Sequence, residues 1–148
     1  MKKVKILDSS LIEKIYEIEK NSFKYPWKKQ FFTYLFKKEN VSVYGLFFNK
    51  ILVGFTVVEY LLNNTVSHIQ NLAINPEYQN RGLGSYFLTK MHKNFRNRNV
   101  KDIFLEVRTS NKKAIALYKK HHYEIVDSLS NYYENNEDAY RMWFNLEN

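Results

Sequence analysis

The alternation of apolar and polar residues along the chain predicts short strands and amphipathic helices. Two-residue alternation or a short apolar run indicates a strand, whereas apolar residues three and four positions apart indicate a helix. By these criteria strands are expected at residues 4–7, 41–48, 51–60, 66–74, 102–107, 123–129 and 139–146, and helices from near Leu11, after Trp27, over 82–98 and after Asn111. This order predicts an α/β fold with a mixed sheet and helices on both of its faces.

Two of these helices have apolar faces that can be assigned to particular residues. On one side of the second helix we expect the apolar residues Phe31, Phe32, Leu35 and Phe36. The last helix is expected to place on one face Ala114, Leu117, Tyr118 and His121.

The chain has only four glycines and two prolines, so each turn signal is informative. Asn49-Lys50 joins two strand-like runs and fits a tight hairpin turn, and Asn63-Asn64 fits a second turn. Pro26 favours an extended Tyr25 and interrupts the first helical region. Asn75-Pro76 ends a strand, because proline cannot donate to a sheet ladder.

Composition narrows the class of protein without identifying it. A length of 148 residues with 45% hydrophobic content predicts one domain, residues 1–148, with a substantial core. The net charge of +8 favours anionic partners such as a phosphorylated cofactor, nucleic acid or a ribonucleoprotein surface, but also fits a solvated basic surface. The absence of cysteine excludes disulfides and a thiolate nucleophile and is compatible with the cytoplasm. Neither a signal peptide nor a membrane span is expected.

The segment from Gln79 to Ser85, which reads Gln-Asn-Arg-Gly-Leu-Gly-Ser, connects a predicted strand to a predicted helix. A helix start attracts anions through its unpaired N–H groups, and glycines let the backbone approach a phosphate closely. A dinucleotide fingerprint is excluded because Phe87 stands where its third glycine is needed, and the Gly-Lys of a P-loop is absent. The segment predicts a phosphate-binding turn, the alternative being a glycine turn without a ligand.

This turn and several separated motifs resemble the GNAT superfamily of acetyltransferases. The turn resembles its Gln/Arg-x-x-Gly-x-Gly/Ala signature, and the run from Leu105 to Tyr118 is similar to the ribosomal-protein alanine N-acetyltransferases and related N-terminal acetyltransferases. Tyr25-Pro26-Trp27, Tyr132-Tyr133 and residues 137–142 resemble loops of the same group. One departure is His122-Tyr123, where the family usually has Gly-Phe. Glycine is favoured there because it accepts a left-handed conformation.

The resemblance implies the GNAT fold, a central, mostly antiparallel mixed sheet of about seven strands flanked by four helices. It also implies acetyl-CoA as cosubstrate. The cofactor contacts that it implies are Leu72, Ala73, Ile74, Gln79, Asn80, Arg81, Gly82, Leu83, Gly84, Ser85, Asn111 and Tyr118. The implied substrate-binding residues are Tyr25, Trp27 and Tyr133, with a hydrophobic clamp between two helices as the alternative for the first two.

Acetyl transfer from a thioester to an amine needs a base for the amine and an acid for the departing thiolate. By the resemblance Glu106 is the candidate base, acting through a water, and Tyr118 is the candidate acid. The alternatives are an outward-facing strand glutamate and a packed core tyrosine. Burial in a strand of apolar alternation is expected to raise the pKa of Glu106. No metal site is expected, since the spacing of the four histidines fits isolated surface or packing residues.

The sequence does not decide which class of amine accepts the acetyl group. An α-amino group has a pKa near 8 and lysine one near 10.4, a difference of roughly 3.4 kcal/mol in deprotonation cost that favours a protein N-terminus. A ribosomal protein is the candidate substrate that the resemblance implies. The alternatives are a lysine or small-amine acetyltransferase and a non-catalytic acyl-CoA- or RNA-binding module. We expect a monomer or small oligomer that binds nucleic acid only incidentally and does not bind membranes.

Overall fold

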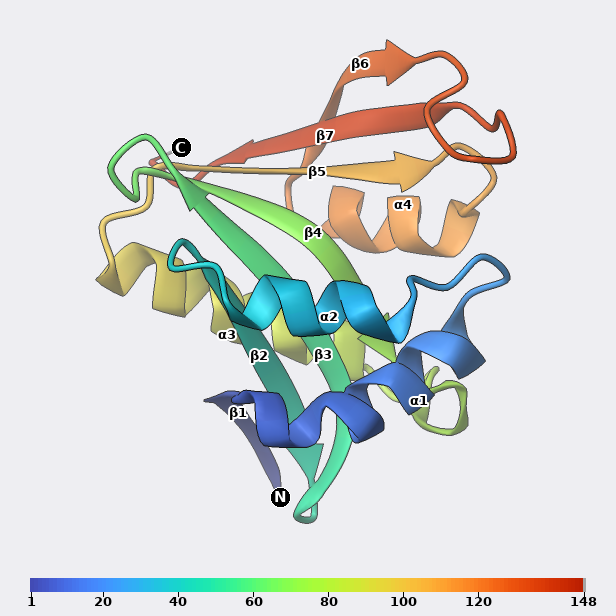
Figure 1. Cartoon of the computed structure of the whole chain (residues 1–148). Coiled ribbons are helices and arrows are strands. Elements are labelled where there is room, and N and C mark those ends of the chain that lie inside the picture. The colour runs from blue at the N-terminus through green and yellow to red at the C-terminus, as the bar shows by residue number, and fades with distance from the viewer. Residues whose placement is uncertain (148) are drawn as a thin grey trace. The chain divides into compact units, whose positions relative to one another are not determined.

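The computed structural model describes residues 1–147, which form one seven-stranded sheet and four α-helices (Figure 1). The strands are β1 (Lys2–Ile6), β2 (Val41–Phe48), β3 (Ile51–Leu61), β4 (Val66–Ile74), β5 (Asp102–Arg108), β6 (Glu124–Leu129) and β7 (Ala139–Asn145). The helices are α1 (Ile12–Ser22), α2 (Lys29–Phe36), α3 (Leu83–Asn97) and α4 (Lys112–Lys120). The predicted α/β class and order of elements are confirmed, with bounds that differ by a few residues.

The sheet has the strand order β1-β2-β3-β4-β5-β7-β6. β4 and β5 are parallel, with Val66–Ile69 opposite Asp102–Leu105, and the connection between them contains α3, as a parallel crossover requires. The pairs β1–β2, β2–β3, β5–β7 and β6–β7 are antiparallel. The sheet is therefore mixed and mostly antiparallel, as predicted.

Both predicted turns have left-handed backbone conformations. Asn49 and Lys50, between β2 and β3, have φ angles of 50° and 70°. Positive φ at both central residues is typical of the tight hairpin turn that matches strand twist, so this prediction is confirmed. Asn63 and Asn64 have φ angles of 55° and 64°, and Leu62 extends the left-handed segment by one residue with φ 50°.

The chain groups into two compact units, each with its own buried side chains. The first unit contains Met1–Glu59 and Gln70–Phe87. The second contains Tyr60–Ile69 and the described residues from Leu88 onward. That residues 1–148 act as one domain stays a prediction.

In the first unit α1 and α2 contribute apolar side chains to a core that includes β2 and β3. Phe32 of α2 is fully buried and its ring meets that of Phe55 edge to face at 5.6 Å. Phe31 is 38% exposed and lies beside the exposed ring of Tyr34. Of the side predicted for this helix, Phe32 and Leu35 are buried, and Phe31 lies at its exposed edge.

In the second unit α3 and α4 pack against β5 and β7. The alternate residues Ile103, Leu105 and Val107 of β5 are buried. The buried residues of α4 are Ile115 and Tyr118, so the predicted face is correct at Tyr118 and otherwise rotated toward Ile115. β5 therefore turns its other face, which carries Glu106, away from these helices.

The end of α4 explains the departure at His122. The φ angle of His122 is 76°, its N–H donates to the carbonyl of Lys119 at 3.0 Å, and the N–H of Tyr123 donates to the carbonyl of Tyr118 at 3.0 Å. This is the Schellman pattern of helix termination. The histidine therefore takes the left-handed conformation that glycine adopts more readily, at a cost of about 1 kcal/mol.

Replacing His122 with glycine is expected to raise the free energy of unfolding by about 1 kcal/mol and Tm by roughly 2–4 °C. The expected gain comes from relief of left-handed strain, since the His122 side chain is exposed. Thermal unfolding followed by circular dichroism measures it. His122→Ala is the control, because alanine keeps the Cβ and with it the strain. An equal Tm for the glycine and alanine variants contradicts the explanation.

Candidate active site

The predicted phosphate turn lies between β4 and α3 in the first unit. Asn80 and Gly82 have φ angles of 63° and 76°. A Cβ at Gly82 would meet no atom within 4 Å, so glycine is favoured there by conformation rather than by space. Left-handed residues within a turn can gather N–H groups into an anion-binding concavity, and the first N–H groups of α3, which point toward the helix start, follow directly. The turn has the geometry for a phosphate, and its occupancy by the cofactor stays a prediction.

Side chains of the same segment hold this turn in shape. Gln79 donates through Nε2 to the carbonyl of Ile74 at 2.9 Å, and Arg81 donates through Nη2 to the carbonyl of Glu77 at 3.2 Å. Arg81 also lies 5.1 Å from the ring centre of Tyr78. Gln79 therefore connects the turn to the last residue of β4, which is one of the three strand residues expected to contact the cofactor.

A buried carboxylate that the sequence interpretation did not single out lies beneath the predicted peptide loop. Glu19 of α1 is 1% exposed, and its Oε2 accepts from the backbone N–H of Trp27 at 2.8 Å. Its Oε1 accepts from Nδ2 of Asn71 in β4 at 2.7 Å. Burial raises the pKa of Glu19 and outweighs these two hydrogen bonds. The sequence signal was a glutamate four residues after Ile15, on the apolar stripe of the helix.

Glu19→Gln is expected to become more stable relative to the wild-type protein as pH rises from 4 to 7. The folded pKa of Glu19 lies above its unfolded value, so its favourable contribution is present below the unfolded pKa and is lost as pH rises through the folded pKa. Glutamine keeps the shape, and the Asn71 amide can turn to bond it. Chemical denaturation at several pH values measures the difference. Glu17→Gln, an exposed site on the same helix, is the control. A pH-independent difference at Glu19 contradicts the assignment.

Trp27 and Tyr25 differ in how they meet the rest of the first unit. The Trp27 ring packs edge to face on Phe31 at 4.8 Å and is tilted against Phe32 at 5.6 Å. Tyr25 is 44% exposed. Trp27 therefore makes the packing contacts expected of a hydrophobic clamp, which was the alternative to substrate binding. The roles of Trp27 and Tyr25 in substrate binding stay predictions.

In the second unit the Glu106 carboxylate lies between two basic side chains. Its Oε1 is 2.6 Å from Nε2 of His68 in β4, and its Oε2 accepts from Nε of Arg141 in β7 at 2.9 Å. The Glu106 side chain is 7% exposed. Burial acts to raise the pKa of Glu106, but the hydrogen bonds and charges of His68 and Arg141 together hold it below its ordinary value. The predicted rise in pKa is therefore wrong, and an isolated Glu106 is a weak base.

His68 is the residue of this cluster that the sequence interpretation missed. Its ring stacks on Phe104 at 4.3 Å between centres, and the two residues are opposite each other in the parallel pairing of β4 and β5. A hydrogen bond to the Glu106 carboxylate requires a proton on Nε2, which both the protonated ring and one neutral tautomer carry, and in that neutral tautomer Nδ1 is the acceptor nitrogen. His68 packs, as expected, but it is not isolated. It forms a histidine–carboxylate pair.

Tyr118 is buried on α4 and meets Tyr123 edge to face at 5.6 Å. Burial, with a smaller contribution from Tyr133, raises the pKa of Tyr118 far above its ordinary value. Its phenol therefore stays protonated and can serve as a hydrogen-bond donor. Tyr123 in turn bonds Nε2 of His92 at 2.8 Å, and burial lowers the pKa of His92 to about 3, so that ring is neutral.

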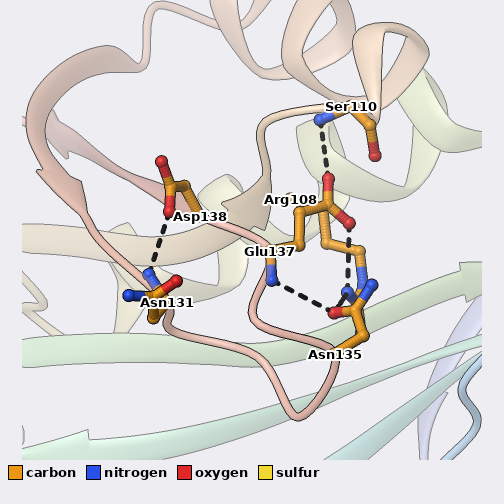
Figure 2. A network of polar contacts seen from close by, with 6 residues as sticks. All are labelled: Arg108, Ser110, Asn131, Asn135, Glu137 and Asp138. Carbon is orange, nitrogen blue, oxygen red and sulfur yellow. Dashed lines mark hydrogen bonds and ion pairs between the residues drawn. The ribbon is translucent and has the colours of Figure 1, made fainter.

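Figure 2 shows how the loop between β6 and β7 is attached to the end of β5. Arg108 donates through Nη1 to Asn135 at 2.7 Å and to Oε1 of Glu137 at 3.1 Å. The other oxygen of Glu137 accepts from the backbone N–H of Ser110 at 3.0 Å. The guanidinium of Arg108 lies 4.0 Å from the ring centre of Tyr133, a cation–π contact. The loop that carries Tyr133 is thereby fixed next to the start of α4.

Three further side chains of the second unit have environments that bear on the predicted site. Burial and then the charge of Glu106 raise the pKa of Tyr132, so this tyrosine belongs with the Glu106 cluster. Burial raises the pKa of Tyr133 to about 12. Asn111 accepts through its side-chain oxygen from the N–H of Ala114 at 3.2 Å and caps α4, as predicted. Its predicted cofactor contact is not tested by that bond.

The described structure thus gathers the predicted residues into two groups, one in each unit. The phosphate turn, the end of β4, Tyr25 and Trp27 belong to the first unit. Glu106, Asn111, Tyr118 and Tyr133 belong to the second. Within residues 1–147 we find no cluster of side chains suited to a metal ion and no helix long and apolar enough to cross a membrane.

Comparison with known proteins decides the family. The model of the acetyltransferase (GNAT) family matches residues 12–123, most of the chain. The chain belongs to the GNAT family. This family member is 34% identical to the putative [ribosomal protein bS18]-alanine N-acetyltransferase of Bacillus subtilis, over 91% of this chain and 89% of that protein. It is 33% identical to an N-alpha-acetyltransferase of Saccharolobus solfataricus, over 75% of this chain and 76% of that protein.

Solved structures agree with this GNAT assignment. The ribosomal-protein-S18-alanine N-acetyltransferase from Escherichia coli superimposes with a TM-score of 0.90 at 28% identity, covering 99% of this chain and 94% of that one. The resemblance inferred from the motifs, and the fold that it implied, are both confirmed.

Proposed function

We propose that this GNAT protein is a protein N-terminal acetyltransferase that transfers an acetyl group directly from acetyl-CoA to an α-amine. The observation that carries the proposal is the His68–Glu106–Arg141 cluster in a chain of this family. The names of the relatives, which specify α-amino or ribosomal-protein alanine acetylation, support the choice of amine. A ribosomal protein is therefore the candidate substrate, and the cytoplasm is the proposed compartment.

The residues of the first unit fit the phosphates of acetyl-CoA. The left-handed conformations of Asn80 and Gly82 would let their N–H groups converge on a phosphate, and Arg81 would add a positive charge. The backbone of Leu72–Ile74 would pair with the pantetheine arm in the manner of an added strand. Asn111 is a further proposed cofactor contact. Acetyl-CoA supplies the thioester acetyl group, and the chain supplies the proton transfers.

The proposed base is the His68–Glu106 pair rather than Glu106 alone. Arg141 keeps Glu106 ionised, and Glu106 fixes the tautomer in which Nδ1 of His68 accepts a proton. The ionised carboxylate also stabilises the imidazolium that this proton creates. Because an α-amine has a pKa near 8, about one molecule in ten is already neutral at pH 7, so removal of its proton needs less help than for lysine. Tyr118, which stays protonated, donates to the departing thiolate.

A peptide library in which only the first residue varies tests the proposed activity. Each peptide has a free N-terminus, acetyl-CoA is the donor, and release of CoA is measured. We expect turnover that depends on the first residue and that disappears when the N-terminus is blocked. Turnover on lysine side chains or polyamines, with none on free N-termini, contradicts the proposed substrate class.

A further inference from the structure

The positive charge of the chain is concentrated in one segment. The full sequence contains 23 Lys and Arg residues and 15 Asp and Glu residues. Residues 88–123 hold ten of the former and only two of the latter, so this segment alone has a net charge of +8. The rest of the chain has thirteen of each and is neutral. The basic balance of the chain is therefore matched by this one segment.

The cations of this segment lie mainly on the exposed faces of two helices. Neither α3 nor α4 contains an aspartate or a glutamate. Their exposed basic side chains, here called the basic helical face, are Lys90, Lys93, Arg96, Lys112, Lys113, Lys119 and Lys120. They stand opposite the buried positions of the same helices, among them Met91 and Phe95 of α3 and Ile115 of α4.

The two helices cover the same side of β7. The ring of His92 in α3 lies 6.1 Å from that of His121 at the end of α4 and 5.1 Å from that of Phe144 in β7. Tyr123, which follows α4, contacts both His92 and Phe144. Because both helices contribute to one ring cluster against Phe144, α4 and the second half of α3 lie on the same side of β7.

Helix stability does not account for this distribution. Cations are favourable near a helix C-terminus, which can explain Arg96, Lys119 and Lys120. Lys112 and Lys113 are the first two residues of α4, where the positive end of the helix dipole disfavours a cation. The helix dipole therefore does not explain the two lysines at the start of α4.

We propose that the basic helical face binds the phosphate backbone of RNA. Interfaces with nucleic acid are polar and rich in positive charge, whereas interfaces between proteins are depleted in lysine. A helix that binds a membrane surface also presents large apolar residues, and α3 and α4 expose none. The proposal goes beyond acetyl transfer and does not depend on it. It would place the enzyme beside substrates that are associated with RNA.

Four substitutions at the ends of the helices test this surface away from the predicted cofactor contacts. The test variant combines K93Q, R96Q, K119Q and K120Q. The matched control combines K3Q, K14Q, K37Q and K50Q, four exposed lysines of the first unit. Each variant has its net charge reduced from +8 to +4. Binding of a labelled short RNA duplex is measured from about 50 to 200 mM salt.

We expect the test variant to bind RNA at least about tenfold more weakly at low salt, with the slope of log affinity against log salt reduced by about three. The control should keep the wild-type slope. An equal loss of RNA affinity in both variants overturns the proposal. So does displacement of the labelled RNA by polyglutamate as effectively as by unlabelled RNA, or binding of anionic lipid vesicles as tight as that of RNA. Acetylation of a short free peptide should be the same in both variants, so failure of RNA binding is distinguishable from failure of the acetyltransferase assignment.

Discussion

Replacing Glu106 with glutamine is expected to lower kcat for acetylation of a peptide α-amine by about 100-fold or more, with KM for acetyl-CoA unchanged. Glutamine has the same shape, but it removes the negative charge that lies 2.6 Å from His68 and 2.9 Å from Arg141. The imidazolium formed on His68 then loses its stabilising partner, and the tautomer of the neutral His68 ring is no longer fixed. Steady-state kinetics with peptide and acetyl-CoA varied separately measure both parameters. Glu124→Gln, an exposed strand glutamate of β6, is the matched control.

His68→Phe distinguishes the pair from Glu106 acting alone. Phenylalanine can keep the stacking on Phe104 but carries no ring nitrogen. If the two residues act as one base, this variant loses as much kcat as Glu106→Gln, and the double variant loses no more than either single one. A near-normal kcat for His68→Phe would show that Glu106 works without the histidine.

Gly82→Ala is expected to raise KM for acetyl-CoA by about tenfold while leaving KM for the peptide unchanged. The φ angle of 76° is unfavourable for a residue with a Cβ, and relaxation of that strain turns the N–H groups of the phosphate turn away from their common direction. A loss of about 1.4 kcal/mol in binding corresponds to the tenfold change. Kinetics at saturating peptide, with acetyl-CoA varied, measure it.

Asn99→Ala provides the matched control for Gly82→Ala. Asn99 has a φ of 63° in the connection between α3 and β5, and asparagine tolerates this left-handed conformation better than alanine does, so the variant loses stability at a position with no predicted cofactor contact. This control should lose stability and keep its KM for acetyl-CoA. If the two variants raise that KM equally, the effect at Gly82 is a general consequence of destabilisation and the phosphate turn is wrongly placed.

The elements of the fold could be predicted because their signals are local. The hairpin turn at Asn49-Lys50 and the end of β4 before Pro76 are set by the backbone preferences of asparagine and proline, which can be identified from the sequence alone. The face of α2 was less certain because the helix has only eight residues and nearly all its apolar side chains are aromatic. The pattern therefore placed Phe31 on the same side as Phe32 and Leu35 without showing that Phe31 is exposed.

The electrostatics of the site could not be predicted because they depend on pairing between distant strands. His68 and Arg141 reach Glu106 from β4 and β7, 38 and 35 residues away in the sequence. Burial of Glu106 was foreseen from the alternation of β5, but the sign of its pKa shift was reversed by these two partners. Glu19 was missed for a similar reason, since its hydrogen-bond partner Asn71 is 52 residues away.

The central claim, that the protein acetylates an α-amine, is tested most directly by one peptide that contains both a free N-terminus and a lysine. The peptide is incubated with the enzyme and acetyl-CoA, and fragment-ion mass spectrometry locates the added acetyl group. We predict a singly acetylated product modified at the α-amine, with the lysine unmodified. Acetylation of the lysine in a product whose N-terminus remains free would contradict the claim.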